Sequence, residues 1–163
     1  MLARMLGDHD RLRQCAARLR ALIDAPTPCD PAELAAVRWD LGSTMMAHLA
    51  FEDRHLYSKL EQDSRPAINA AGRAFQSELR AQFGAYAEHA KSWTPQRVAA
   101  DWTSYGTAVS RFLALLLERI DREERELYPL VEEAGIVTIG SAPVRDNWTR
   151  EAFAIKDQIR KGL

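Results

Sequence analysis

Apolar residues recur at three- and four-residue spacing through four long stretches of this chain, and five of its seven prolines lie in a link between two stretches or at the start of a stretch. This spacing is the period of an amphipathic α-helix. It predicts helices over about residues 1–24, 31–62, 66–92 and 94–134. Four such helices with short links predict an all-α fold, an antiparallel up-down four-helix bundle.

Residues at the ends of the stretches support these boundaries. Asp30 and Pro31 are typical of a helix N-cap and its first turn, as are Thr94 and Pro95, and Gly135 is placed to end the last helix. We therefore expect a bundle domain over residues 1–134 and a C-terminal extension over 135–163. In that extension, a short amphipathic fifth helix is predicted from four apolar residues: Trp148, Ala152, Ile155 and Ile159.

Composition excludes several classes of function. The 163 residues carry 22 Lys and Arg against 23 Asp and Glu, so a net charge of −1 offers no basic field for nucleic acid or an anionic membrane. No apolar run is long enough to cross a membrane, and no secretory leader is recognisable. Cys15 and Cys29 form neither a disulfide framework nor a CxxC metal pair, so both are expected to be free thiols. A cytoplasmic protein is expected.

Charged and imidazole side chains interrupt the apolar faces of all four predicted helices. The inward residues are His9, His48, Glu52, His89, Arg119 and Glu123. Burying an ionised group costs several kcal/mol unless something compensates it. A single inward histidine is commonly just a hydrogen-bonded core residue, and the acids would be solvated if the predicted helix phases were wrong. All four histidines of the chain need an explanation, however.

The spacing of His48 and Glu52 indicates what could compensate these buried groups. Residues four apart on a helix project into the same space, and imidazole with carboxylate is a donor set for iron, zinc or manganese. Helical bundles build metal sites from such side chains on facing helices. A metal ion inside the bundle is therefore one interpretation.

Two segments of the chain share a local pattern. His48–Tyr57 reads HLAFEDRHLY, and Arg119–Pro129 reads RIDREERELYP. The first resembles the HxxxEE…LY signature of the hemerythrin-like, HHE cation-binding family, and the second has the same spacing. The segment Asp8–Leu12 is similar to the family's first-helix histidine segment, and His89 corresponds to its third-helix histidine.

The resemblance implies a four-helix bundle around a carboxylate-bridged, non-haem di-iron centre, used for oxygen carriage, oxygen or redox sensing, or iron handling. By this resemblance, His9 and His48 serve one metal, His89 serves a second, and Glu52 and Glu123 bridge them. Glu124 is the alternative carboxylate donor.

The main departure from the family is Arg119, which stands where the fourth-helix histidine belongs. A guanidinium stays protonated and cannot ligate a metal, but it can supply charge-assisted hydrogen bonds to the acids that a second ion would bridge. Two outcomes follow. Either His9, His48, Glu52 and Glu123 keep one divalent ion, or a metal-free network of arginine, carboxylates and histidines fills the centre.

Other residues near the pattern have weaker interpretations. His55 and Glu126 occupy matching positions in the two segments. Two interpretations follow: a displaced metal site formed with Glu52 and Glu123, or a simple His55–Glu126 ion pair. The ion pair is favoured. The tyrosines of the pattern, Tyr57 and Tyr128, are expected only to pack the helix ends with their hydroxyls on backbone atoms.

The expected function is metal binding, with a redox, oxygen or small-gas responsive or iron-handling role and a small diatomic ligand. No nucleophile, base and oxyanion grouping is recognisable, so an enzyme is less favoured, and an oxygen- or peroxide-using metalloenzyme is a third reading. The alternative is a metal-free bundle for protein association. In either case the C-terminal helix is expected to make a homo-oligomer.

Overall fold

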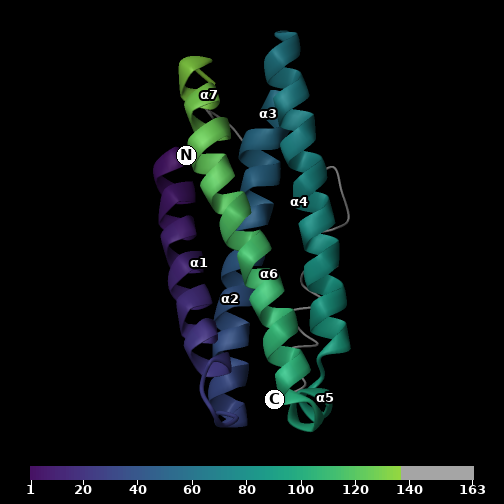
Figure 1. The fold of residues 1–163 in the computed structure, drawn as a ribbon. Coiled ribbons are helices and arrows are strands. Elements are labelled where there is room, and N and C mark those ends of the chain that lie inside the picture. Colours follow the sequence, from purple (N-terminus) through teal and green to yellow (C-terminus); the bar gives the residue numbers. More distant parts are fainter. Residues whose placement is uncertain (137–163) are drawn as a thin grey trace.

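The fold is a bundle of four antiparallel helical rods, seen in a computed structural model that describes residues 1–136 (Figure 1). The first rod is α1 and the third is α4, while the second and fourth consist of several helical segments. The bounds are α1 Leu2–Ile23, α2 Pro31–Glu52, η1 Asp53–Tyr57, α3 Ser58–Leu60, α4 Pro66–Ser92, α5 Pro95–Ala100, α6 Trp102–Arg122, η2 Glu123–Leu127 and α7 Tyr128–Glu133. The predicted fold class is confirmed; the predicted fifth helix lies outside the described residues.

The helix ends follow the expected capping chemistry, with one exception. The Asp30 side chain accepts from the backbone N–H groups of Ala32 and Glu33, and Gly135 has a φ of 64°, the left-handed conformation expected after a helix. The predicted helix over 94–134 is wrong in its first turns. Asp101 has non-helical backbone angles (φ −143°, ψ 71°), and its side chain accepts from Ser104 N–H, so it ends α5 and caps α6.

Apolar stripes from all four rods meet along the axis of the bundle. Its fully buried side chains include Met5, Leu12, Met45, Leu79 and Leu113. No helix of the described chain is long and apolar enough to span a membrane. The polar groups that are buried among these apolar side chains need partners inside the bundle.

One turn in each of the second and fourth rods is π-helical, namely η1 and η2. A π turn closes i→i+5 hydrogen bonds. Residues five apart lie about 140° apart in a regular α-helix, and the wider turn brings them onto one face. Tyr57 and Tyr128, each five residues after a glutamate, are 0% and 4% exposed, so the π turns point both tyrosines into the bundle.

Candidate metal centre

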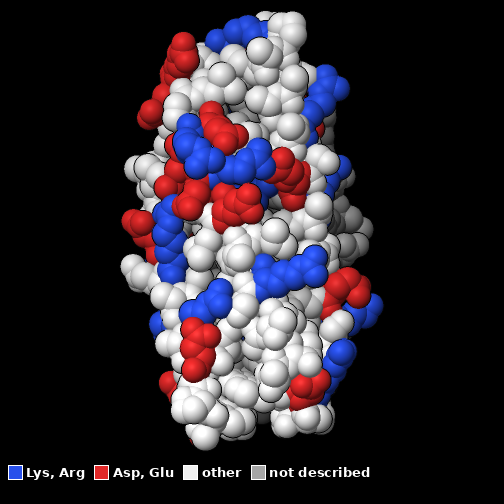
Figure 2. Space-filling view, viewed as in Figure 1, with Lys and Arg blue, Asp and Glu red and all other residues white. Residues whose placement is uncertain are grey.

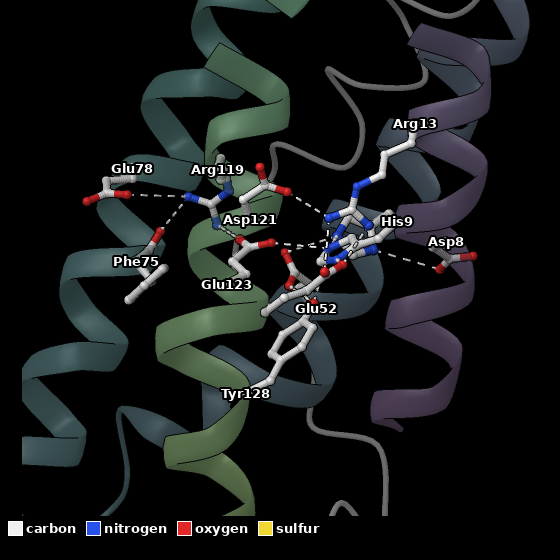
Figure 3. Close-up of polar contacts among 12 residues, drawn as sticks. Asp8, His9, Arg13, Glu52, Phe75, Glu78, Arg119, Asp121, Glu123 and Tyr128 are labelled. Carbon is white, nitrogen blue, oxygen red and sulfur yellow. Dashed lines mark hydrogen bonds and ion pairs between the residues drawn. The ribbon is translucent and has the colours of Figure 1, made fainter. Parts of the chain in front are cut away.

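Four side chains with metal-ligating atoms converge inside the bundle. His9 comes from α1, His48 and Glu52 come from the C-terminal end of α2, and Glu123 begins η2. One ligating atom of each lies within 4.8 Å of the others. All four residues are at most 2% exposed, and Figure 3 shows Glu52 and Glu123 pointing toward His9 between the rods. We call these four residues the cluster.

The spacing within the cluster suits a single metal ion. His9 Nε2 lies 3.1 Å from His48 Nε2 and 3.3 Å from Glu123 Oε2, and His48 Nε2 lies 3.5 Å from Glu52 Oε2. With bonds of about 2.1 Å, neighbouring ligand atoms around an ion are separated by about 3.0 to 3.4 Å. The donor atoms are therefore already close to the spacing of a coordination shell.

The cluster also contains one ligating oxygen that lacks a hydrogen-bond partner. Glu52 Oε2 is buried and has no hydrogen bond. Burial, then the neighbouring Glu123 carboxylate, raises the pKa of Glu52 well above its usual value. Burial, followed by the charges of His9 and Arg119, lowers the pKa of His48 to about 3. A neutral imidazole beside a carboxylate that disfavours its own charge is an environment that a bound cation would stabilise.

Arg119 lies beside the cluster and is bonded on several sides. Its Nη2 donates to the Tyr57 hydroxyl at 2.8 Å, its Nη1 donates to the Phe75 carbonyl at 3.1 Å, and it forms an ion pair with Glu123. Burial by itself lowers the pKa of Arg119, but Glu123 and the other acidic groups around it raise it above its ordinary value. The guanidinium is therefore a permanent positive charge between α4 and the cluster (Figure 3).

Tyr57 and Tyr128 bond to the acids of the cluster rather than to backbone atoms, which corrects the expectation that they only pack helix ends. Tyr57 donates to Glu123 Oε1 at 3.3 Å, and Tyr128 donates to Glu52 Oε1 at 3.2 Å. The Tyr128 hydroxyl also lies 3.2 Å from His9 Nε2. Burial is the main cause of a raised pKa in both tyrosines, so both remain protonated donors. The signal in the sequence was the shared five-residue step from Glu to Tyr.

Glu124 approaches the outer side of His9 rather than the cluster. Its Oε1 accepts from His9 Nδ1 at 2.8 Å, on the opposite side of the ring from the nitrogen that faces the cluster. The hydrogen bonds from Arg13 are the main cause of a lowered pKa for Glu124. Glu124 thus stands behind a predicted ligand, where the sequence had suggested an alternative donor.

His89 does not join the cluster, so the placement expected for it from the family resemblance is wrong. Phe75 and Glu78 of α4 contact Arg119, and His89 lies 14 and 11 residues further along the helix, or about 17 to 21 Å away at 1.5 Å per residue. There its ring stacks on Phe112 at 5.6 Å between centroids, beside a cavity of about 20 Å³. Burial lowers its pKa to about 4.

His55 and Glu126 also lie outside the cluster, and the structure contradicts both the displaced site and the favoured ion pair between them. The His55 ring packs on Phe51 with 4.4 Å between centroids. Glu126 pairs with Arg122 at 3.5 Å and with Arg125 at 3.1 Å. Figure 2 shows acidic and basic side chains intermingled on one face of the molecule.

Comparison with known proteins agrees with the geometry. The family model of the hemerythrin HHE cation binding domain matches residues 1–131. No curated protein and no solved structure matches the chain. The family match and the buried cluster both indicate metal binding. Because the match covers most of its length, the chain belongs to the hemerythrin HHE cation-binding family.

Proposed function

We propose that this protein binds one divalent metal ion, by preference iron, through His9, His48, Glu52 and Glu123. We further propose that it serves as a redox, oxygen or small-gas responsive or iron-handling module rather than as a high-turnover enzyme. The observation that carries the proposal is the convergence of two imidazole nitrogens and two carboxylate oxygens at one buried point. Such a donor set suits iron, zinc and manganese.

The two oxygens of each acid in the cluster have different partners, and this difference supports a single ion. Oε1 of Glu52 accepts from Tyr128, and Oε1 of Glu123 accepts from Tyr57 and pairs with Arg119. Oε2 of each acid faces a histidine nitrogen instead. The Oε2 atoms therefore face the two histidines that would share an ion with them, whereas the Oε1 atoms, which would bridge to a second ion, already have partners on the far side.

In the described part of the chain, the third rod contributes no residue to the cluster, and its carboxylate Glu78 pairs with Arg122 at 2.8 Å and faces Arg119 at 3.9 Å instead. There Phe75 offers its carbonyl to Arg119, the Gln76 amide donates to Asp53 at 3.3 Å, and Leu79 is buried in the core. A second ion would thus meet a guanidinium where it needs an imidazole. We infer that Arg119 supplies the positive charge of the second ion but does not coordinate ligands as that ion would.

The residues around the cluster keep water away from it. Met5 and Met45 are fully buried about one turn before His9 and His48 on the same helices. A bound iron would supply reversible one-electron chemistry and a coordination position for a small diatomic ligand. Because α1, α2 and η2 each contribute to the cluster, a change of charge or ligand there would alter the packing of three rods at once.

The test is metal retention by matched histidine variants. Purified protein is loaded with ferrous iron without oxygen, desalted, and analysed for bound metal by mass spectrometry. His48→Ala should lose most of the metal that the wild type retains, whereas His55→Ala and His89→Ala should retain it. Equal loss from all three, or a wild type that holds no more iron than a His9→Ala/His48→Ala double variant, would contradict the proposal. The second result would favour the metal-free association module.

Two extensions of the test address the finer parts of the proposal. Loading with zinc and manganese under the same conditions ranks the metals, and iron is expected to be retained at least as well as manganese. Exposing the iron-loaded protein to oxygen or nitric oxide should change its visible and electron paramagnetic resonance spectra. An unchanged spectrum with both gases would count against the small-gas role.

A further inference from the structure

The two histidines of the cluster differ at the ring nitrogen that faces away from it. His9 Nδ1 donates to Glu124 Oε1 at 2.8 Å. His48 Nδ1 has Asp8 Oδ2 at 3.8 Å, beyond hydrogen-bond distance, and both of these buried atoms lack a hydrogen-bond partner. One imidazole is therefore fixed from behind, while the other only faces a carboxylate.

Glu124 is itself held in place from α1. Arg13 donates to both of its oxygens at 2.9 Å and also donates to Asp121 at 2.8 Å. Arg13 stands four residues after His9 on α1 (Figure 3). The histidine and the arginine therefore reach the Glu124 carboxylate from successive turns of one helix. The paired hydrogen bonds from a guanidinium fix the position of a carboxylate as well as its charge.

This arrangement determines which nitrogen of His9 can carry its proton. An ionised carboxylate only accepts hydrogen bonds, so the 2.8 Å contact places the N–H of a neutral His9 on Nδ1. Nε2 then presents a lone pair to the cluster. In the opposite tautomer, the proton on Nε2 would occupy the position from which a metal is bound.

We propose that Glu124, clamped by Arg13, is a positioning residue that holds His9 in its Nδ1–H tautomer and turns Nε2 toward the cluster. The effect of Glu124 on metal affinity rests on the proposed function, but its effect on the tautomer does not. Carboxylates behind metal-ligating histidines typically change metal affinity 10- to 100-fold. Asp8 lacks the corresponding hydrogen bond to His48 and should matter less.

The first experiment needs no metal. Long-range ¹H–¹⁵N correlation spectra of ¹⁵N-labelled, metal-free protein near neutral pH report the tautomer of each histidine. His9 should be in the Nδ1–H form in the wild type and in Glu126→Ala, a matched change at a nearby surface acid. Glu124→Ala should give a mixture of tautomers, and Glu124→Gln should restore the Nδ1–H form because the amide oxygen still accepts. A wild type with the proton on Nε2, or no change in Glu124→Ala, overturns the proposal.

The second experiment measures manganese affinity by titration of the same proteins. Glu124→Ala should bind about 10- to 100-fold more weakly, Glu124→Gln should recover part of that loss, and Asp8→Asn should change affinity less than Glu124→Ala. If Asp8→Asn costs as much as Glu124→Ala, the asymmetry between the histidines is refuted. If the wild type binds no metal while its His9 tautomer still depends on Glu124, the proposed function fails and the positioning role stands.

Discussion

The two copies of the sequence pattern, His48–Tyr57 and Arg119–Tyr128, give the most instructive comparison in the molecule. Each has a glutamate four residues after its first member, a π turn, and a tyrosine five residues after the glutamate. The tyrosine of each copy bonds to the glutamate of the other. The two copies thus have the same backbone conformation, and they make reciprocal hydrogen bonds from the tyrosine of one copy to the glutamate of the other.

The copies differ at their first residue, and the partners of that residue differ accordingly. His48 directs its Nε2 into the cluster, whereas Arg119 reaches past Glu123 to the Phe75 carbonyl. The same backbone arrangement therefore carries a candidate metal ligand in the first copy and a permanent cation in the second. A carboxylate pair inside a bundle needs positive charge, but that charge can be an ion or a guanidinium.

The largest effect on stability is expected from removing Glu123, the glutamate of the second copy. Glu123→Ala leaves the Arg119 guanidinium buried without its main counter-ion, which should lower the free energy of unfolding by about 3 to 5 kcal/mol. Urea denaturation of metal-free protein measures this. Glu126→Ala is the control at an exposed acid, and a loss no larger than that of the control would mean that the ion pair is not what compensates Arg119.

Making the two copies alike should have the next largest effect. Arg119→His removes the hydrogen bonds to Phe75 and Tyr57 and should lower the stability of the metal-free protein by about 2 to 3 kcal/mol. It should also release Glu123 Oε1 from its ion pair with Arg119, leaving only the hydrogen bond from Tyr57. More metal should then bind per chain, with the additional ion held weakly because α4 offers no imidazole at that height. Metal analysis at rising iron concentration checks this, and unchanged uptake would show that Arg119 does not limit the number of ions.

The crossed tyrosines allow a smaller and more symmetric test. Tyr57→Phe and Tyr128→Phe each remove a hydrogen bond to a buried carboxylate, at a cost of about 1 to 2 kcal/mol in unfolding free energy. Tyr57→Phe should cost more, because the Tyr57 hydroxyl also accepts from Arg119. Equal costs in urea denaturation would indicate that the tyrosines do not distinguish the two copies.

His89 gives a reference outside both copies, and near neutral pH its titration should have the smallest effect on stability. Its pKa is about 4 in the folded protein against 6.5 for a free imidazole, so the unfolded chain binds more protons between these values. Stability should therefore fall as the pH drops from about 6.5 to 4, by at most about 1.4 kcal/mol per pH unit from this residue. His89→Phe keeps the ring and removes the titration. Denaturation of metal-free protein at several pH values should show a shallower pH dependence in the variant; equal slopes would contradict the assignment.

Much of the fold could be predicted from local sequence signals. Apolar periodicity and the capping residues Asp30, Thr94 and Gly135 depend on chemistry within a few residues, and they located the rods. The break at Asp101 was missed because the helix-forming pattern continues through it, and only the cap on Ser104 reveals it. Periodicity alone does not mark a position where two helices abut.

Part of the cluster could also be predicted from local sequence signals. His9, His48, Glu52 and Glu123 were found because each interrupts an apolar stripe, and the structure brings them together. His89 interrupts a stripe too, but its height along the bundle depends on how α4 is set against the other rods, which no local pattern encodes. The tyrosine bonds depend on π turns, and a pattern based on regular helices places those side chains on the wrong face.

The most direct test of the account is the number of metal ions per folded chain. Wild-type protein, loaded with excess ferrous iron without oxygen and desalted, is weighed intact by native mass spectrometry. We predict one ion per chain, held by the cluster with Arg119 in place of a second. Two ions per chain, or none beyond the His9→Ala/His48→Ala background, would contradict the account.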